Sequence, residues 1–124
     1  MVSKLHEQTK KVLQSLYPNC PIIEEYPIKV NGGQNLRIDL VVDFPFNVAV
    51  ECQGAQHEKF VPHFHKDSLG FKNYQRRDRL KDNWCFEHFF ALVYVYEGEE
   101  ITKELLQRKI EDAERKLDKD FGVD

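Results

Sequence analysis

Hydrophobic residues follow two different periods along the chain, and these periods predict helices around a β-rich centre. Residues 3–16 and 101–117 repeat apolar side chains every three or four positions, the spacing of one helical face. Residues 70–84 show the same spacing, with Leu80 and Trp84 on the apolar side. Four other segments are rich in Ile, Val and aromatic residues and predict strands: residues 20–30, 36–42, 48–53 and 89–96.

Turn residues between these segments predict how the strands connect. The run Asn31-Gly32-Gly33 supplies residue types that accept positive φ, so the first two strands form a hairpin. Pro27 cannot donate a ladder hydrogen bond, which predicts that the first strand lies at an edge of the sheet or contains a bulge. The apolar run 89–96 follows a helix, and it predicts a buried central strand that is parallel to a neighbour.

These elements predict an α+β domain with one mixed sheet of about four strands, an antiparallel hairpin plus a parallel C-terminal strand, flanked by helices. A chain of 124 residues fits a single domain over residues 1–124. No apolar run reaches the ~20 residues of a membrane span, and no signal-peptide pattern opens the chain, so we expect a cytoplasmic protein without membrane contact. Three isolated cysteines indicate neither a disulfide framework nor a zinc ribbon.

Two acidic residues stand in segments that otherwise predict apolar strands. Asp39 lies in the middle of residues 36–42, and Glu51 follows an apolar run on the next strand. A carboxylate in an apolar strand costs several kcal/mol unless it is paired or binds a metal. If the two strands are neighbours, the acids converge, and Mg²⁺ typically takes one or two carboxylates plus substrate phosphates. The alternative is structural: Asp39 pairs with Arg37 or caps the strand, and Glu51 belongs to a polar strand face.

The run Glu51-x-x-Gly-x-x-His57, with Asp39 before it and Asp78-x-x-Lys81 on the following helix, resembles the PD-(D/E)XK nuclease superfamily. More narrowly, it is similar to the very-short-patch-repair-like branch and to the phage homing endonucleases described as EDxHD enzymes. The resemblance covers residues 3–96. It implies a restriction-endonuclease-like core and Mg²⁺-dependent hydrolysis of DNA phosphodiester bonds that leaves a 5′-phosphate.

The same resemblance implies a metal site and a base. Mg²⁺, with Mn²⁺ as a substitute, is held by Asp39, Glu51 and the backbone carbonyl of Cys52. His57 is the candidate base, because an imidazole near its neutral pKa can deprotonate or hold the attacking water. The structural alternative for His57 is a histidine hydrogen-bonded at the end of a strand.

Four further site residues follow from comparing the chain with the family pattern. Gln53 stands where the family name expects lysine, so an obvious positive charge is missing. Lys81 is the candidate replacement from the helix, with Asp78 orienting it or a water. Glu7 on the first helix is the nearest match to a glutamate that often supports the metal in this family, although the helical period turns it away from the apolar stripe.

Local charge predicts where a phosphate backbone binds. The net charge of the chain is −3, yet basic residues outnumber acidic ones between residues 59 and 81. The alternative is a solvated helix with internal ion pairs. A zinc site at the histidine pair of this segment is the weaker interpretation, because no cysteine lies nearby. The candidate DNA contacts are Lys59, His63, His65, Lys66, Lys72, Arg76, Arg77 and Arg79.

Three functional hypotheses follow. The first is a homing or repair-like endonuclease that nicks or cuts double-stranded DNA, phage-encoded and acting in the host cytoplasm, with a homodimer or homo-oligomer as one route to a long target. The second is a catalytically inactive PD-(D/E)XK fold that binds DNA or a partner, which Gln53 favours. The third is a structure-selective or RNA-directed nuclease with the same metal site.

Overall fold

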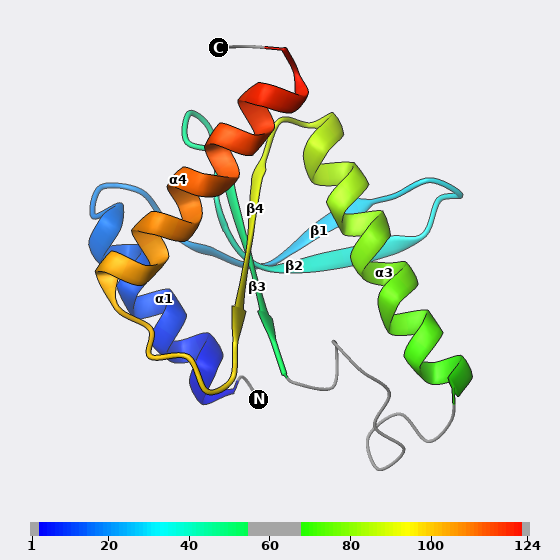
Figure 1. Cartoon of the computed structure of the whole chain (residues 1–124), viewed down its shortest axis with the longest axis horizontal. Helices are drawn as coiled ribbons and strands as arrows, with labels where there is room; N and C mark the ends of the chain where they lie inside the picture. Colours follow the sequence, from blue (N-terminus) through cyan, green and yellow to red (C-terminus); the bar gives the residue numbers. More distant parts are fainter. Residues whose placement is uncertain (1–2, 55–67, 123–124) are drawn as a thin grey trace.

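The structure, a computed structural model, describes residues 3–54 and 68–122 and contains one mixed sheet between helices. The helices are α1 (Lys4–Leu16), α3 (Ser68–Glu87) and α4 (Lys103–Asp120). The strands β1 (Ile23–Lys29), β2 (Asn35–Val42), β3 (Val48–Gln53) and β4 (Ala91–Tyr96) lie in the order β1-β2-β3-β4. Strand β2 is antiparallel to both of its neighbours, β1 and β3, and β4 is parallel to β3, which confirms the predicted α+β class and hairpin (Figure 1). The PD-(D/E)XK core stays a prediction.

Two hydroxyl side chains cap the N-termini of α1 and α4. The Ser3 hydroxyl accepts a hydrogen bond from His6 N at 3.1 Å and caps α1. The Thr102 hydroxyl accepts from Leu105 N at 3.1 Å and caps α4 in the same way. Such caps satisfy backbone N–H groups that have no partner inside the helix. They fix where each apolar stripe starts relative to the sheet.

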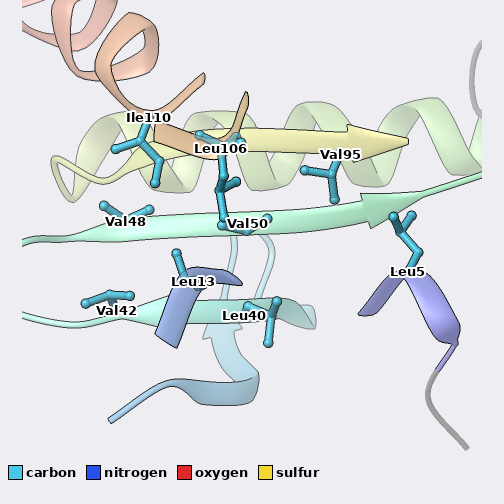
Figure 2. Packing of buried hydrophobic residues seen from close by; sticks show 10 residues of the cluster. Leu5, Leu13, Leu40, Val42, Val48, Val50, Val95, Leu106 and Ile110 are labelled. Atoms are coloured by element: carbon cyan, nitrogen blue, oxygen red, sulfur yellow. The ribbon is translucent and has the colours of Figure 1, made fainter. Parts of the chain in front are cut away.

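The side of the sheet that faces α1 and α4 is packed with aliphatic residues. Val48 and Val50 of β3 meet Leu13 of α1 and Leu106 of α4 there, and all four are fully buried (Figure 2). Alternate strand residues share a face, which is why the even-numbered positions of β3 supply this cluster. The full cluster is Leu5, Leu13, Leu40, Val42, Val48, Val50, Val93, Val95, Leu106 and Ile110.

The opposite side of the sheet faces α3 and combines apolar packing with polar groups. Leu80 and Trp84 of α3 pack there against a cluster that includes Ala49 of β3, as the helical period predicts. Glu51 and Gln53 continue the same alternation along β3 and are also buried. The apolar cluster on this side is Ile28, Val30, Ile38, Val41, Ala49, Cys85 and Phe90.

Strand β2 changes faces at Asp39. Ile38 packs in the cluster on the α3 side, whereas Leu40, two positions later, packs in the cluster on the α1 and α4 side. Regular pleating would put both residues on one face, so the strand is twisted between them. Glu25, between the β1 residues paired with Ile38 and Leu40, has a left-handed φ of 53°. Both strands of the hairpin are therefore distorted at the level of Asp39.

Strand β4 lies at an edge of the sheet, so the prediction that residues 89–96 form a central strand was wrong. The run is apolar because helices cover both of its faces, with α4 on one side and α3 on the other. Its open edge is partly satisfied by side chains. Lys109 Nζ donates to Tyr94 O at 2.8 Å, and Glu99 Oε1 accepts from Tyr96 N at 2.8 Å. Strand β1 occupies the other edge, as Pro27 predicts.

Candidate active site

Asp39 and Glu51 lie side by side where β2 and β3 separate. The last pair of the β2–β3 ladder is Leu40 with Val50, and Asp39 and Glu51 lie next to this pair. Beyond this pair, side chains replace the ladder bonds: Glu51 Oε2 accepts from Asp39 N at 2.8 Å, and Asp39 Oδ2 accepts from Cys52 N at 2.8 Å. Each acid is thus held by the backbone of the other strand. The structure brings together the two carboxylates that the sequence singles out.

Lys81 reaches this pair from α3. Its Nζ lies 2.6 Å from Glu51 Oε1, and the two side chains are 16% and 5% exposed. Burial, followed by the negative charge of Asp39, raises the pKa of Glu51 from 4.5 to about 7, although Lys81 acts in the opposite direction. The surroundings therefore only partly compensate the charge that the Glu51 carboxyl has when it is ionised. A further cation next to it would favour the ionised form.

The backbone carbonyl of Cys52 is directed toward β2. The carbonyls of Asn47 and Gln53 accept from Ala91 N and Glu97 N, so odd-numbered residues of β3 bond toward β4. Even-numbered residues bond to the other side, since the N–H and C=O of one strand residue leave on the same side. Cys52 N accordingly bonds to Asp39, and its carbonyl faces the same gap. Burial raises the pKa of the Cys52 thiol to about 12, so the thiol stays protonated.

Gln53 is buried and its amide nitrogen makes no hydrogen bond with the residues that the structure describes. An amide nitrogen without a partner in a buried place costs free energy, and an ordered water or a bound ligand would remove that cost. Gln53 lies on the same face of β3 as Glu51, two residues farther along the strand. A substrate oxygen or water beside the carboxylate pair would satisfy it.

Of the two further candidates, Asp78 lies near the carboxylate pair and Glu7 lies apart from it. Asp78 is one helical turn before Lys81, and its negative charge contributes to raising the pKa of Asp82 and of Tyr94. It therefore lies near Asp82 and Tyr94. Glu7 is exposed on α1, as the helical period indicates, and none of the contacts among described residues joins it to Asp39 or Glu51.

Several candidates cannot be placed. His57, proposed as the base, lies outside the described residues, as do Lys59, His63, His65 and Lys66. The four remaining candidate DNA contacts are Lys72, Arg76, Arg77 and Arg79, and all are exposed on α3. These basic residues thus precede Lys81 on the same helix.

The sequence reading missed a pair beside the site, Asp82 and Tyr94. Tyr94 is the partner of Glu51 in the parallel β3–β4 pairing, and its hydroxyl donates to Asp82 Oδ1 at 2.5 Å. Burial is the main cause that raises the pKa of both groups. The alternation Tyr94-Val95-Tyr96 was the available signal, because it puts two phenols on one face of the strand.

A second missed contact ties α1 to the hairpin. Glu24 of β1 accepts from Lys10 Nζ at 2.9 Å, and its other oxygen lies 2.9 Å from His6 Nε2. The bond from Lys10, then that with His6, lowers the pKa of Glu24. Glu24 is paired with Leu40, next to Asp39 in the chain. Helix α1 thus contributes His6 and Lys10 at this level of the sheet, rather than Glu7.

We call the point where β2 and β3 separate, at Asp39, Glu51 and Cys52, the fork. Its residues suit a hard cation with few protein ligands. Asp39, Glu51 and the Cys52 carbonyl offer oxygen donors, the ligand type that Mg²⁺ prefers. No group of three or more His, Cys, Asp or Glu side chains within residues 3–54 and 68–122 is arranged to hold a metal ion. Two carboxylates with waters or phosphate oxygens fit the habit of Mg²⁺, which rarely uses an all-protein cage. Zinc, which takes three or four side-chain ligands, does not fit this donor set.

Comparisons with known proteins give relatives without an assigned role. The chain is similar to uncharacterized protein 307L of Invertebrate iridescent virus 6, with 45% identity over 65 residues, which are 52% of this chain and 32% of that protein. It is also similar to uncharacterized protein 033L of Invertebrate iridescent virus 3, with 36% identity over 63 residues, 51% of this chain and 32% of the relative. The matched segments thus span about a third of these proteins.

Two other comparisons found nothing. No protein-family model matches the chain, and no solved structure matches it. None of the helices among the described residues is long and apolar enough to cross a membrane.

Proposed function

We propose that the chain is a Mg²⁺-dependent DNA endonuclease whose cation is held by Asp39, Glu51 and the Cys52 carbonyl. The observation that carries the proposal is the fork between β2 and β3. There, two carboxylates from neighbouring strands are fixed by each other's backbone, and one of them is buried with a pKa of about 7. Perturbed carboxyls of this kind cluster at catalytic sites. The resemblance to the PD-(D/E)XK motif supports the same assignment.

Phosphodiester hydrolysis needs a cation that neutralises charge on the phosphate and acidifies a water, and a bound Mg²⁺ supplies both. The chain's own residues do the rest. Asp39 and Glu51 are held rigidly by backbone hydrogen bonds, so their oxygens keep their positions. His57 is the proposed base, and the Gln53 amide is a donor for a phosphate oxygen or for the attacking water.

Lys81 supplies the positive charge that Gln53 cannot. Its ammonium already lies against Glu51, within reach of any phosphate at the fork. A lysine on a helix that packs over the strand can stabilise developing negative charge on the phosphate as one on the strand would. Asp78 lies one helical turn before Lys81, and the hydrogen bond between Tyr94 of β4 and Asp82, the residue after Lys81, restricts the position of this part of α3.

Double-stranded DNA is the proposed substrate, for which the exposed basic residues of α3 provide the backbone contacts. Both relatives come from iridescent viruses, which supports a viral setting for the enzyme, with action in the cytoplasm of the host cell. A homodimer would extend the length of duplex that so small a domain can read.

Cleavage of supercoiled plasmid with Mg²⁺ tests the proposal. We expect nicked or linear product from the wild type, none with a chelator, and a loss of about 100-fold or more in rate for Asp39→Asn, because charge stabilisation at the phosphate is worth several kcal/mol. The matched control is Asp43→Asn, an exposed acid in the β2–β3 turn that loses the same charge. Equal rates in the two variants would reject the site.

One observation favours a second function, an inactive module that only binds DNA. Lys81 occupies Glu51 at 2.6 Å, so an ammonium stands where a cation would help to neutralise the pair. In that case Mg²⁺ would neither bind nor protect the chain against unfolding, while duplex binding would persist. A structure-selective or RNA-directed nuclease would instead cleave flaps or RNA faster than plain duplex DNA, which competition between these substrates measures.

A further inference from the structure

The hairpin that joins β1 to β2 and the middle of α3 form two walls of one cleft. This cleft has a volume of about 180 Å³ and is lined by Gln34 from the hairpin and by Asn73, Arg76, Arg77 and Leu80 from α3. The helix residues recur at the spacing i, i+3, i+4 and i+7, so they form a single stripe along α3. We call this space the arginine cleft.

A second stripe of α3 runs beside the first and faces the active site. Its members are Lys81, which contacts Glu51, Asp82, which accepts from the Tyr94 hydroxyl, and Cys85, which is buried against the sheet. One rigid helix therefore carries both the wall of the arginine cleft and the lysine of the catalytic pair. Whatever binds in the cleft is held at a fixed distance from Glu51.

The polar lining of the arginine cleft offers hydrogen-bond donors and no carboxylate. Both arginines are exposed, and none of the ion pairs among the described residues involves them. A guanidinium binds phosphate through two parallel hydrogen bonds, and the Gln34 and Asn73 amides can donate to the same oxygens. At about 30 Å³ for each water, the cleft has room for one hydrated phosphate group.

The tip of the hairpin leaves the cleft open to a polymer. Gly32 and Gly33 have positive φ values of 87° and 80°, and a Cβ added at either position would meet no atom within 4 Å. Asn31 and Gln34, on either side of them, are exposed. The tip is therefore a narrow loop with little side-chain bulk, which lets a nucleic-acid backbone come close to the arginines.

We propose that the arginine cleft binds a backbone phosphate of the duplex that the active site cuts, so that the hairpin and α3 clamp one strand. This inference rests on the proposed function. A rise of 1.5 Å per residue puts Arg77 about 6 Å from Lys81 along the axis of α3. A phosphate in the arginine cleft therefore lies close, on the same strand, to the one that faces Glu51.

The clamp predicts that the basic residues of α3 contribute unequally to DNA binding, although their charges are the same. Arg76 and Arg77 line the arginine cleft and hold a phosphate directly. Lys72 and Arg79 are exposed outside it and attract the duplex only at longer range. Substituting the cleft arginines should therefore weaken binding more than substituting Arg79.

Duplex binding measured by fluorescence anisotropy in a chelator, across about 50 to 200 mM salt, tests the clamp without any catalysis. We expect Arg76→Gln/Arg77→Gln to lower affinity at least ~10-fold at the low-salt end and to reduce the slope of log K against log salt by about 1, the change for one lost phosphate contact. The control Lys103→Gln/Arg108→Gln removes two exposed charges from α4 and should leave both quantities near wild type. Gln34→Glu, which brings a carboxylate into the cleft, should also weaken binding.

Three results would overturn the clamp: wild-type chain that does not bind duplex at low salt, a cleft double variant that binds as its control does, or a preference for single-stranded RNA over duplex DNA. Failure of the proposed function looks different. A chain with the expected binding pattern that does not hydrolyse DNA with Mg²⁺ keeps the clamp and loses the nuclease. Hydrolysis with an unchanged KM in Arg76→Gln/Arg77→Gln keeps the nuclease and loses the clamp.

Discussion

On the side of α1 and α4 the sheet meets its helices mainly through aliphatic side chains, whereas on the side of α3 the same strands bury charge. Val48 and Val50 point to the first side and touch Leu106 and Leu13. Their neighbour Glu51 points to the second side, where it meets Lys81 and the backbone of Asp39. Within six residues, one strand serves both environments.

The difference separates the side of the sheet that mainly stabilises the fold from the side that carries the candidate active site. Aliphatic burial contributes roughly 25 cal/mol per Å² and makes no demand on geometry beyond packing. Burying Glu51 costs free energy that Lys81 only partly offsets, and its pKa of about 7 measures that imbalance. A strand that only needed stability would carry an apolar residue there, so the cost indicates a functional reason.

The largest expected effect is on the aliphatic side. Leu106→Ala leaves a cavity in a fully packed cluster and should lower the free energy of unfolding by about 2–5 kcal/mol in a urea titration. Leu105→Ala, at a half-buried neighbouring position, is the control and should cost less. The affinity for Mg²⁺ should not change in the folded variant. A change in Mg²⁺ affinity would break the separation between the two sides.

Next comes the ion pair on the α3 side. Lys81→Met removes the ammonium that faces Glu51, and we expect cleavage to fall about 10- to 100-fold while duplex binding in a chelator stays within a factor of about two. Lys116→Met, an exposed lysine of α4, is the control for lost charge. If Lys81→Met cleaves as fast as that control, the lysine is structural only.

The pH dependence of stability distinguishes the two sides further. Because the pKa of Glu51 is raised from 4.5 to about 7 in the folded chain, folded Glu51 holds a proton that the unfolded chain has already lost. Wild type should therefore lose roughly 3 kcal/mol of stability relative to Glu51→Gln as pH rises from about 4.5 to about 7, and no more above it. Urea midpoints at several pH values measure this, and a difference that grows in the opposite direction would contradict it.

The smallest effect concerns the hydroxyl of Tyr94. Tyr94→Phe removes the bond to Asp82 and should cost about 1 kcal/mol in thermal or urea unfolding, with a small loss of cleavage because α3 is less well fixed. Tyr26 packs against the apolar cluster on the α3 side, and its hydroxyl makes no hydrogen bond among those of the described residues, so Tyr26→Phe should be nearly neutral. Equal costs would show that Asp82 does not need its partner.

Local patterns were enough to predict most of the fold. Ser3 caps its helix, Pro27 marks an edge strand and the glycine turn makes the hairpin, because each depends on neighbours in sequence. The position of β4 could not be predicted this way. A strand covered by helices on both faces is as apolar as one between two strands, so hydrophobicity cannot distinguish them.

Only the part of the site that depends on the pairing of neighbouring strands could be predicted from the residues. Asp39 and Glu51 meet because antiparallel neighbours put opposite residues together, which the sequence shows. Lys81 entered through the resemblance, since no spacing rule links α3 to β3. The Asp82–Tyr94 bond and the bonds of Glu24 were missed, because they join elements whose relative placement is set by packing of the whole domain.

Calorimetric titration of Mg²⁺, and of Mn²⁺, into the chain at a pH above 7 tests the central claim most directly. The account predicts one cation for each chain, bound by wild type and by Asp43→Asn, and at least ~10-fold weaker binding in both Asp39→Asn and Glu51→Gln. Binding that is absent from wild type, or that survives unchanged when either acid at the fork is replaced, would contradict it.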